Sequence, residues 1–391
     1  MTDKIVVEDV YKIFGPKPEL AKEMIEQGHD KAEIFEQTGH TVGVQKASFS
    51  IREGEIFVVM GLSGSGKSTM VRMLNRLIDP TYGAVHVNGQ DITKMSTEQL
   101  ISLRRKDMSM VFQSFALMPH QTVLENAAFG LEVAGIERSE REQRALDALE
   151  QVGLKPNARS YPSELSGGMK QRVGLARALA VDPSILLMDE AFSALDPLIR
   201  TQMQDELIEL QKKKARTVVF ISHDLDEAMR IGDRIAIMEQ GKVVQIGAPD
   251  EIVTNPADEY VRSFFHGVDV TKVFTGGDLA RRDHGSVIED ANASPQAVRE
   301  QLQKDGHDSG VVVDGGHKFL GVVSERSLAS ADDLKSAYLE DVEPARSDMA
   351  LGDVLSRVAH ATVPVPVVDD DGKYLGSVSK TALLQTLDRT G

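Results

Sequence analysis

Cysteine is missing from the sequence: none of the 391 residues is a cysteine. Disulfide bonds, iron-sulfur clusters held by cysteine and thiolate zinc sites are therefore excluded. The absence fits a chain that works in a reducing compartment, and the cytosol is the expected location.

Basic residues are in the minority, with 44 lysines and arginines against 60 aspartates and glutamates, and the formal net charge is −16. Binding to a nucleic-acid backbone depends on basic side chains that displace counterions. A chain with this excess of acid is not expected to bind DNA or RNA unaided. We therefore expect no nucleic acid among its partners.

Long apolar runs are also missing. The longest, such as "EIFVVM" and "ILLM", fall far short of the ~20 residues that cross a bilayer. The start, "MTDKIVVEDV", has neither the basic stretch nor the apolar run of a secretion signal, so export is not expected. Any work at a membrane has to go through a partner protein.

The first positive feature is "GLSGSGKS" at residues 61–68, between a strand pattern and a helix pattern. In such a phosphate loop, glycines let backbone N–H groups converge on phosphates, and the helix N-terminus adds partial positive charge. A merely flexible glycine and serine loop is the alternative. We expect Lys67 to hold the β- and γ-phosphates and Ser68 to bind Mg²⁺. The residues expected to contact the nucleotide are Gly61, Ser63, Gly64, Ser65, Gly66, Lys67, Ser68 and Thr69.

The apolar strand "ILLMDE" ends in two carboxylates, Asp189 and Glu190. Because successive strand residues point to opposite faces, the two are not expected to share one role if the strand continues that far. We expect Asp189 in the Mg²⁺ shell and Glu190 as the general base that polarises the attacking water. An acidic strand end that faces solvent is the alternative.

Two further side chains are candidates for the same site. His223 follows the strand "TVVFIS", and at the C-terminal edge of a parallel sheet its imidazole can bond a γ-phosphate; a capping or core histidine is the alternative. Gln113, in "MVFQSFALMPH", can reach Mg²⁺ or the water through its amide oxygen. We predict as catalytic residues Glu190, His223 and Gln113, and as metal ligands Ser68, Gln113 and Asp189.

A second glycine turn, "LSGGMKQ" at residues 165–171, also runs into a helix. A helix N-terminus with hydroxyl and glycine N–H donors is an anion site, yet the chain's own phosphate loop has no need of it. Taken alone, the heptapeptide is equally a plain helix start. Further along, Asp196 followed by proline is typical of a helix N-cap.

Strand patterns alternate with helix patterns, which predicts an α/β parallel sheet. Residues 1–14 alternate like a strand, and residues 16–42 form a polar insert of two short helices separated at Gly28. Residues 94–165 are predicted to be mostly helical.

The last part of the chain contains an internal repeat. "VVVDGGHKFLGVVS" at 311–324 aligns without a gap on "PVVDDDGKYLGSVS" at 366–379, which predicts two copies of one small unit. The acid run at 369–371 is expected to be a hairpin turn, with a metal site as the alternative.

Together these motifs resemble an ATP-binding-cassette (ABC) nucleotide-binding domain. The resemblance covers residues 1–270 and implies an α/β fold of the P-loop NTPase class. It has a RecA-like core, a helical subdomain at about 94–168 and a family-specific insert at about 16–42. ATP and Mg²⁺ are the implied cofactors. The motifs that follow the family's order and spacing are the phosphate loop, Gln113, the second glycine turn, "ILLMDE", "SALD" (193–196) and His223.

The resemblance also implies why one chain has two phosphate grips. In this family the second turn contacts the γ-phosphate of ATP held by a second copy, so a homodimer sandwiches two nucleotides head to tail, and the loop at Asp196 crosses the interface. Phe14 is similar to the aromatic that stacks on adenine, with a core position as the alternative. The residues implied to complete the partner's pocket are Leu165, Ser166, Gly167, Gly168, Gln171 and Asp196.

Over its whole length the chain is similar to the ATPase subunits of the glycine betaine/L-proline (quaternary amine) uptake family. The resemblance implies an ATPase that drives an integral membrane permease from the cytoplasmic face of the plasma membrane, with a solute-binding protein as an indirect partner. The segment "FALMPH" is the implied permease contact. An importer motor for choline, carnitine or an amino acid, or an ABC ATPase outside transport, is the alternative.

Residues 278–391 resemble a tandem pair of CBS (cystathionine-β-synthase) domains of α+β type, at about 278–337 and 338–391. The implied role is regulatory. CBS motifs that bind adenosine ribose usually end in Asp, whereas the corresponding residues here are Ser327 and Ala382. Ordinary adenine-nucleotide sensing is therefore not expected. A cyclic dinucleotide, salt sensing and dimer support remain open.

Overall fold

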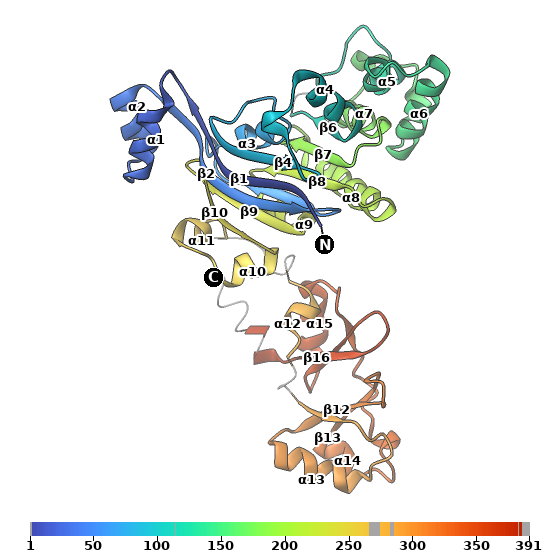
Figure 1. Cartoon of the computed structure of the whole chain (residues 1–391). Helices are drawn as coiled ribbons and strands as arrows, with labels where there is room; N and C mark the ends of the chain where they lie inside the picture. The colour runs from blue at the N-terminus through green and yellow to red at the C-terminus, as the bar shows by residue number, and fades with distance from the viewer. Residues whose placement is uncertain (1, 114, 266–273, 282–284, 382, 385–391) are drawn as a thin grey trace. The chain divides into compact units, whose positions relative to one another are not determined.

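The computed structural model describes residues 2–113, 115–265, 274–281, 285–381 and 383–384 (Figure 1). The chain forms two compact units. The first contains residues 1–252 and 256–261, and the second contains 253–255 and 262–391.

A six-stranded sheet in the order β10-β9-β3-β8-β7-β6 forms the base of the first unit. All neighbours are parallel except β10, which pairs with β9 as a hairpin. Every residue of β3, β7 and β8 is buried, as expected for parallel strands covered on both faces. The strands are β3 (Ile56–Met60), β6 (Met108–Val111), β7 (Ile185–Asp189), β8 (Thr217–Ser222), β9 (Arg234–Glu239) and β10 (Lys242–Gly247).

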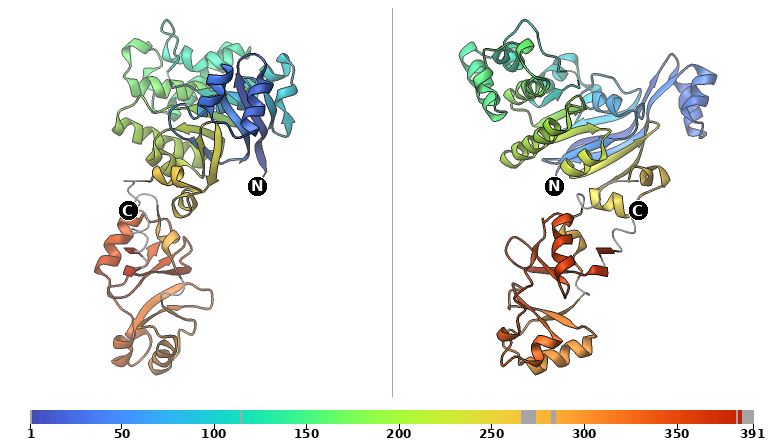
Figure 2. Two further views of the ribbon diagram at one scale, coloured as in Figure 1. Left: turned by 90° about the vertical axis from the view of Figure 1, so that its left-hand side faces the viewer. Right: turned by 180° about the vertical axis from the view of Figure 1, so that it is seen from behind.

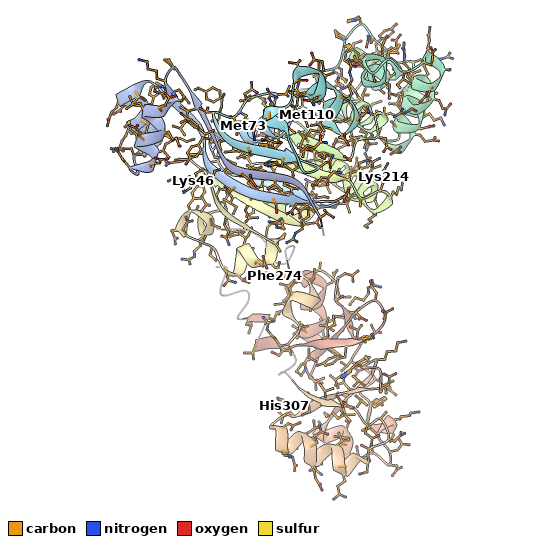
Figure 3. The ribbon with its side chains drawn as sticks, in the orientation of Figure 1. Lys46, Met73, Met110, Lys214, Phe274 and His307 are labelled. Atoms are coloured by element: carbon orange, nitrogen blue, oxygen red, sulfur yellow. The ribbon has the colours of Figure 1, made fainter. Side chains whose placement is uncertain are left out.

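An antiparallel sheet in the order β2-β1-β4-β5 accompanies it. One cluster of buried side chains joins both sheets to helix α3 (Lys67–Leu74); it contains Met73, and Met110 packs against it (Figure 3). The shared core fixes the start of α3, and therefore the phosphate loop, between the sheets. The strands are β1 (Asp3–Phe14), β2 (Thr41–Arg52), β4 (Tyr82–Val87) and β5 (Gln90–Asp91).

Helices account for the remainder of the first unit. The α5–α7 group and the α1–α2 pair lie at opposite ends of the unit (Figures 1 and 2). Short 3₁₀ turns occur at η1 (Ile92–Lys94), η2 (Lys155–Asn157) and η3 (Pro162–Glu164). Besides α3 and the helices of the insert, the helices are α4 (Thr97–Lys106), α5 (Val123–Val133), α6 (Arg138–Gln151), α7 (Gly167–Ala180), α8 (Pro197–Lys213) and α9 (Leu225–Ile231), followed by α10 (Pro249–Thr254) and α11 (Glu259–Ser263), which extend past the boundary of the unit.

The stretch 94–165, which was predicted to be mostly helical, also contains a strand. Strand β6 interrupts it and pairs with β7 at the edge of the parallel sheet. Four residues are too few for periodicity to separate a strand from a helix, so pairing with a neighbouring strand decides the outcome.

The insert folds as predicted into two helices, α1 (Pro18–Glu26) and α2 (Lys31–Thr38). Asp30 caps α2 in a capping box with Glu33, which fixes the break between them. The pair packs on the ends of β1 and β2 in a small separate core, formed by Ile13, Ala21, Met24, Ile34 and Val42.

The second unit contains two three-stranded sheets, which confirms the predicted repeat. The Asp314 carboxylate accepts hydrogen bonds from the N–H groups of Gly316 and Lys318, and that of Asp369 accepts from Asp371 and Lys373, all at 2.8–3.0 Å. The acid run is thus a hairpin turn, and the described residues contain no cluster suited to a metal ion. The sheets are β11 (Ser286–Ile288), β12 (Ser309–Val313) and β13 (Phe319–Ser324), then β14 (Ala345–Arg346), β15 (Val365–Val368) and β16 (Tyr374–Val378).

The two repeats are not divided as simply as the sequence suggests. Helix α12 (Gly276–Leu279) precedes the first repeat but folds with the second, where Gly276 N–H donates to the Met349 carbonyl at 2.8 Å and Arg281 pairs with Ser377. A helix that precedes one repeat but packs with the other leaves no periodic signal in the sequence. The other helical segments are α13 (Pro295–Asp305), α14 (Glu325–Ala329), η5 (Lys335–Ala337) and α15 (Leu351–His360).

Candidate active site

The loop at residues 61–68 joins β3 to α3 and needs glycine for steric reasons. Gly61, Gly64 and Gly66 have φ values of 151°, 79° and 104°, which side chains disfavour. A Cβ at Gly61 would lie 2.2 Å from the Met238 carbonyl oxygen, and one at Gly66 would lie 2.3 Å from that of Gly43. The loop therefore presses its backbone against both sheets.

Lys67 lies inside the curve of this loop. Its ammonium donates to the carbonyl oxygens of Gly61 at 2.8 Å and Leu62 at 3.0 Å. Burial lowers the pKa of Lys67, while the carboxylates of Glu190 and Asp189 act in the opposite direction. A buried cation bordered by glycine turns is suited to an anionic ligand.

Asp189 ends β7 and is buried next to α3. It accepts a hydrogen bond from Ser68 Oγ at 2.9 Å and pairs with Arg72 Nη2 at 3.2 Å. Hydroxyl and carboxylate oxygens beside a phosphate loop suit Mg²⁺, which binds through few protein oxygens and completes its shell with phosphate and water. Arg72 was not among the predicted site residues, although its position four residues after Ser68 places both on one face of α3.

Glu190 begins a turn rather than continuing the strand, with φ of 45°. Its Oε2 lies 3.1 Å from Gln113 Nε2 and 3.5 Å from His223 Nδ1. The three residues predicted to be catalytic are therefore brought together, and Ser193 joins them through a 2.9 Å hydrogen bond from Oγ to the Glu190 carbonyl. Of the three predicted metal ligands, Ser68 is hydrogen-bonded to Asp189, whereas Gln113 is hydrogen-bonded to Glu190.

A cavity of about 300 Å³ lies against the phosphate loop. Phe14 stands at its edge with 41% of its surface exposed, so it is not a core residue. An exposed aromatic face there can stack on a flat ring. Three lining residues were not predicted: Thr41, Val42 and Gly43, at the end of the predicted insert and just after it. They reach the cavity because β2 pairs with β1, the strand that ends in Phe14. The full lining is Phe14, Thr41, Val42, Gly43, Ser63, Gly64, Gly66, Lys67, Ser68, Thr69 and Glu190.

The second glycine turn is the start of α7. Ser166 is the N-cap, with Oγ accepting from the Met169 N–H at 3.3 Å, and Leu165 before it is buried. Gln171 is 1% exposed, and its amide atoms have no partner among the described residues. Among the described residues, no hydrogen bond connects this turn to the phosphate loop of the same chain.

Gly168 at the start of α7 also faces α8. A Cβ at Gly168 would lie 2.6 Å from Ile199 Cγ2, and Gly167 lies near the Phe115 ring. Asp196 caps α8, since its Oδ1 accepts from the Ile199 N–H at 3.1 Å and Pro197 follows, as expected of an N-cap.

Comparison with known proteins identifies the family. The sequence profile described as "ABC transporter" matches residues 44–193, and the CBS domain profile matches 337–389. The glycine betaine/proline betaine transport system ATP-binding protein ProV of Salmonella typhimurium is 57% identical, over 100% of this chain and 99% of its own length. The chain belongs to the ATP-binding subunits of ABC transporters. The glycine betaine transport ATP-binding protein OpuAA of Bacillus subtilis is 49% identical, over 98% of this chain and 92% of its own.

Solved structures agree with this assignment. The dimeric structure of a bacterial ABC transporter cassette is 31% identical, has a TM-score of 0.54 and covers 62% of this chain and 98% of its own. A dimeric post-hydrolysis state of the same cassette, bound to ADP and Pi, has a TM-score of 0.53. This ABC subunit is thus an ATPase with a cassette fold and a C-terminal CBS domain. Among the described residues, no helix has the length and apolar character of a membrane span.

Proposed function

We propose that two copies of this ABC subunit form the ATP-hydrolysing motor of an importer for glycine betaine, proline betaine and related quaternary amines. The observation that carries the proposal is the 57% identity to a glycine betaine/proline betaine subunit along the entire chain, through both the cassette and the tail. The motor works at the cytoplasmic face of the plasma membrane by driving a permease, and a solute-binding protein delivers the solute to that permease.

The geometry supports a distinct role for each predicted residue. Lys67, inside the phosphate loop, binds the β- and γ-phosphates, and Ser68 and Asp189 hold Mg²⁺. When bound, the ion neutralises charge on the phosphate oxygens. Glu190 accepts a proton from the attacking water, since its carboxylate lines the cavity and lies beside His223 and Gln113, which orient the water and the γ-phosphate.

The second copy completes each pocket through the start of α7. The Ser166 hydroxyl and the glycine N–H groups at the N-terminus of this fourteen-residue helix form an anion site. We assign to this site the γ-phosphate of the ATP that the partner copy holds. The dimeric state of the similar bacterial cassette supports the arrangement.

The CBS tail has a regulatory role in this proposal. Ser327, which stands where a ribose-binding carboxylate is usual, is engaged locally: its N–H bonds Ser324 Oγ and its hydroxyl bonds the Ser324 carbonyl, both at 3.1 Å. Ala382, the corresponding residue of the second repeat, lies outside the described residues. We therefore propose that the first repeat responds to a signal other than the binding of an ordinary adenosine nucleotide.

Reconstitution tests the function. The subunit is assembled with its permease and solute-binding protein in vesicles that contain ATP, and uptake of radiolabelled glycine betaine is compared with proline betaine, choline, carnitine and proline. We expect the two betaines to stimulate ATP hydrolysis and to accumulate. Stimulation by choline or carnitine alone would contradict the proposed solute. No stimulation by any of the five solutes would contradict the motor role.

A further inference from the structure

Lys31 is the first residue of helix α2 in the insert, and its side chain is partly buried against the turn between β9 and β10. That turn contains Gly241, with φ of 84°. A Cβ at Gly241 would lie 3.1 Å from both Cε and Nζ of Lys31. The ammonium therefore rests directly on the backbone of this glycine.

The Lys31 ammonium has no counter-charge in the structure. Among the described residues it makes no hydrogen bond or ion pair, and burial alone lowers the pKa of Lys31. The first turn of a helix is also unfavourable for a cation because the helix dipole is positive there. The neighbouring acids Asp30 and Glu33 are engaged in the capping box of α2. A partly buried charge without a partner loses some of its hydration, which points to a ligand that compensates it.

Gly241 connects this ammonium to the nucleotide cavity. Its N–H donates to the Ser65 carbonyl of the phosphate loop at 2.8 Å. A Cβ at Gly66 would lie 2.3 Å from the Gly43 carbonyl oxygen and 3.5 Å from Gly241 Cα, so the three glycines are packed together. Gly43 and Gly66 both line the cavity. Lys31 thus rests on a group of glycine backbones, two of which form the cavity wall.

We infer that Lys31 is a further nucleotide-binding residue, which supplies positive charge from the insert to a nucleoside polyphosphate in the phosphate-loop cavity. Because Lys31 is partly buried and glycine backbone lies between its ammonium and the cavity, water screens its attraction for phosphate less than that of a fully exposed lysine. The attraction grows with the charge of the ligand. Lys31 therefore favours the triphosphate over the diphosphate and has little effect on an uncharged nucleoside.

Nucleotide binding to the full-length chain tests the inference. Lys31→Met removes the charge and keeps the length of the side chain, and Lys31→Arg keeps the charge. Dissociation constants for ATP, ADP and adenosine are measured by calorimetry at low and high salt. We expect Lys31→Met to weaken ATP binding by about tenfold, ADP binding by less and adenosine binding hardly at all, with a smaller salt dependence. Lys31→Arg is expected to bind like the wild type.

Lys242→Met is the matched control, because Lys242 is exposed and adjoins Gly241 in the same turn. Losing a charge there is expected to leave ATP binding unchanged. ATP affinity in Lys31→Met equal to that of the wild type would overturn the inference. An equal loss for ATP and adenosine would overturn it too, because that pattern means a distorted cavity rather than a lost charge. Thermal unfolding without nucleotide is measured alongside, and we expect Lys31→Met to be no less stable than the wild type.

The inference rests on the proposed nucleotide site, and Lys67→Ala separates the two. Loss of ATP binding in Lys67→Ala places the nucleotide at the phosphate loop, and the Lys31 variants then decide the inference alone. Retained ATP binding in Lys67→Ala counts against the proposed site itself, and with it against Lys31 as part of that site.

Discussion

Asp189 and Glu190 are neighbours in the chain but have different surroundings. Asp189 receives hydrogen bonds from Ser68 and Arg72 on α3, whereas Glu190 lies beside Gln113 and His223. The left-handed backbone at Glu190 produces this separation because it turns the chain immediately after β7. Such a conformation costs of order 1 kcal/mol or more and persists where its surroundings enforce it.

Replacement of Glu190 by Gln tests its role as general base. The amide keeps the size of the carboxylate but cannot accept the proton of water, so we expect ATP hydrolysis to fall by roughly 10²- to 10⁴-fold. ATP binding should persist, because Lys67 and the phosphate loop are unchanged. Phosphate release and fluorescent-nucleotide binding measure the two effects separately. Hydrolysis at the wild-type rate would show that another group takes the proton.

Phe14 is expected to stack on the adenine ring. Its exposed face borders the cavity, and loss of an aromatic stacking partner typically weakens binding by about 1–3 kcal/mol. We therefore expect Phe14→Ala to weaken ATP binding by roughly 5- to 150-fold and Phe14→Tyr to preserve it. Phe35→Ala is the control, since Phe35 is an exposed aromatic on the insert that does not line the cavity. Equal affinities in wild type and Phe14→Ala would rule out stacking.

The sequence predicted the residues of the site better than their contacts. The phosphate loop and "ILLMDE" are local motifs, so Lys67 and Asp189 were identifiable without a structure. The contact between Arg72 and Asp189 joins residues 117 positions apart. Thr41 lies at the cavity because β2 pairs with β1 beyond the two helices of the insert. Long-range pairing of this kind has no signature in a local pattern.

At the scale of elements, helices α7 and α8 meet at Gly168. The proposed dimer gives this glycine a role in the partner's pocket, but within the chain Gly168 also lies against Ile199. A methyl group at Gly168 would come within 2.6 Å of Ile199 Cγ2, so the two helices have to shift apart. Packing inside one chain thus demands glycine here independently of any nucleotide.

Gly168→Ala is therefore expected to destabilise the isolated chain by about 1–3 kcal/mol, as is usual for overpacking. Adding Ile199→Ala creates space for the new methyl and is expected to restore part of that stability relative to Ile199→Ala alone. Chemical denaturation of the wild type, both single variants and the double variant measures the coupling. Strictly additive effects would mean that the two side chains do not interact.

Periodicity in the sequence predicted correctly whether a segment is a helix or a strand where the segment was long. The insert helices and the strand over residues 1–14 were predictable because their apolar residues follow helical and alternating spacing respectively. The short strand β6 was not, since its place in the sheet depends on β7, which is 74 residues further along the chain. Likewise, the pairing of Arg281 with Ser377 in the second unit could not be read from a repeat that begins at residue 311.

At the scale of the whole molecule, the proposed motor requires two chains. The phosphate loop and the start of α7 both suit phosphate, and in the proposed dimer each nucleotide lies between the loop of one copy and the α7 turn of the other. A chain with Lys67→Ala then retains a working turn, and a chain with Ser166→Arg retains a working loop. Neither variant forms a complete pocket with itself.

Mixed dimers of these two variants test the composite pocket. Co-expressed with different tags and purified together, each mixed dimer has one complete site, so it should hydrolyse ATP although both parents are inactive. A random mixture contains half mixed dimers and should reach at most about a quarter of wild-type activity, because each has one site of two. Pairing Lys67→Ala with the double variant Lys67→Ala/Ser166→Arg leaves both sites incomplete and serves as the control. Mixed dimers as inactive as the control would contradict the composite pocket, because a pocket built within one chain leaves every site damaged.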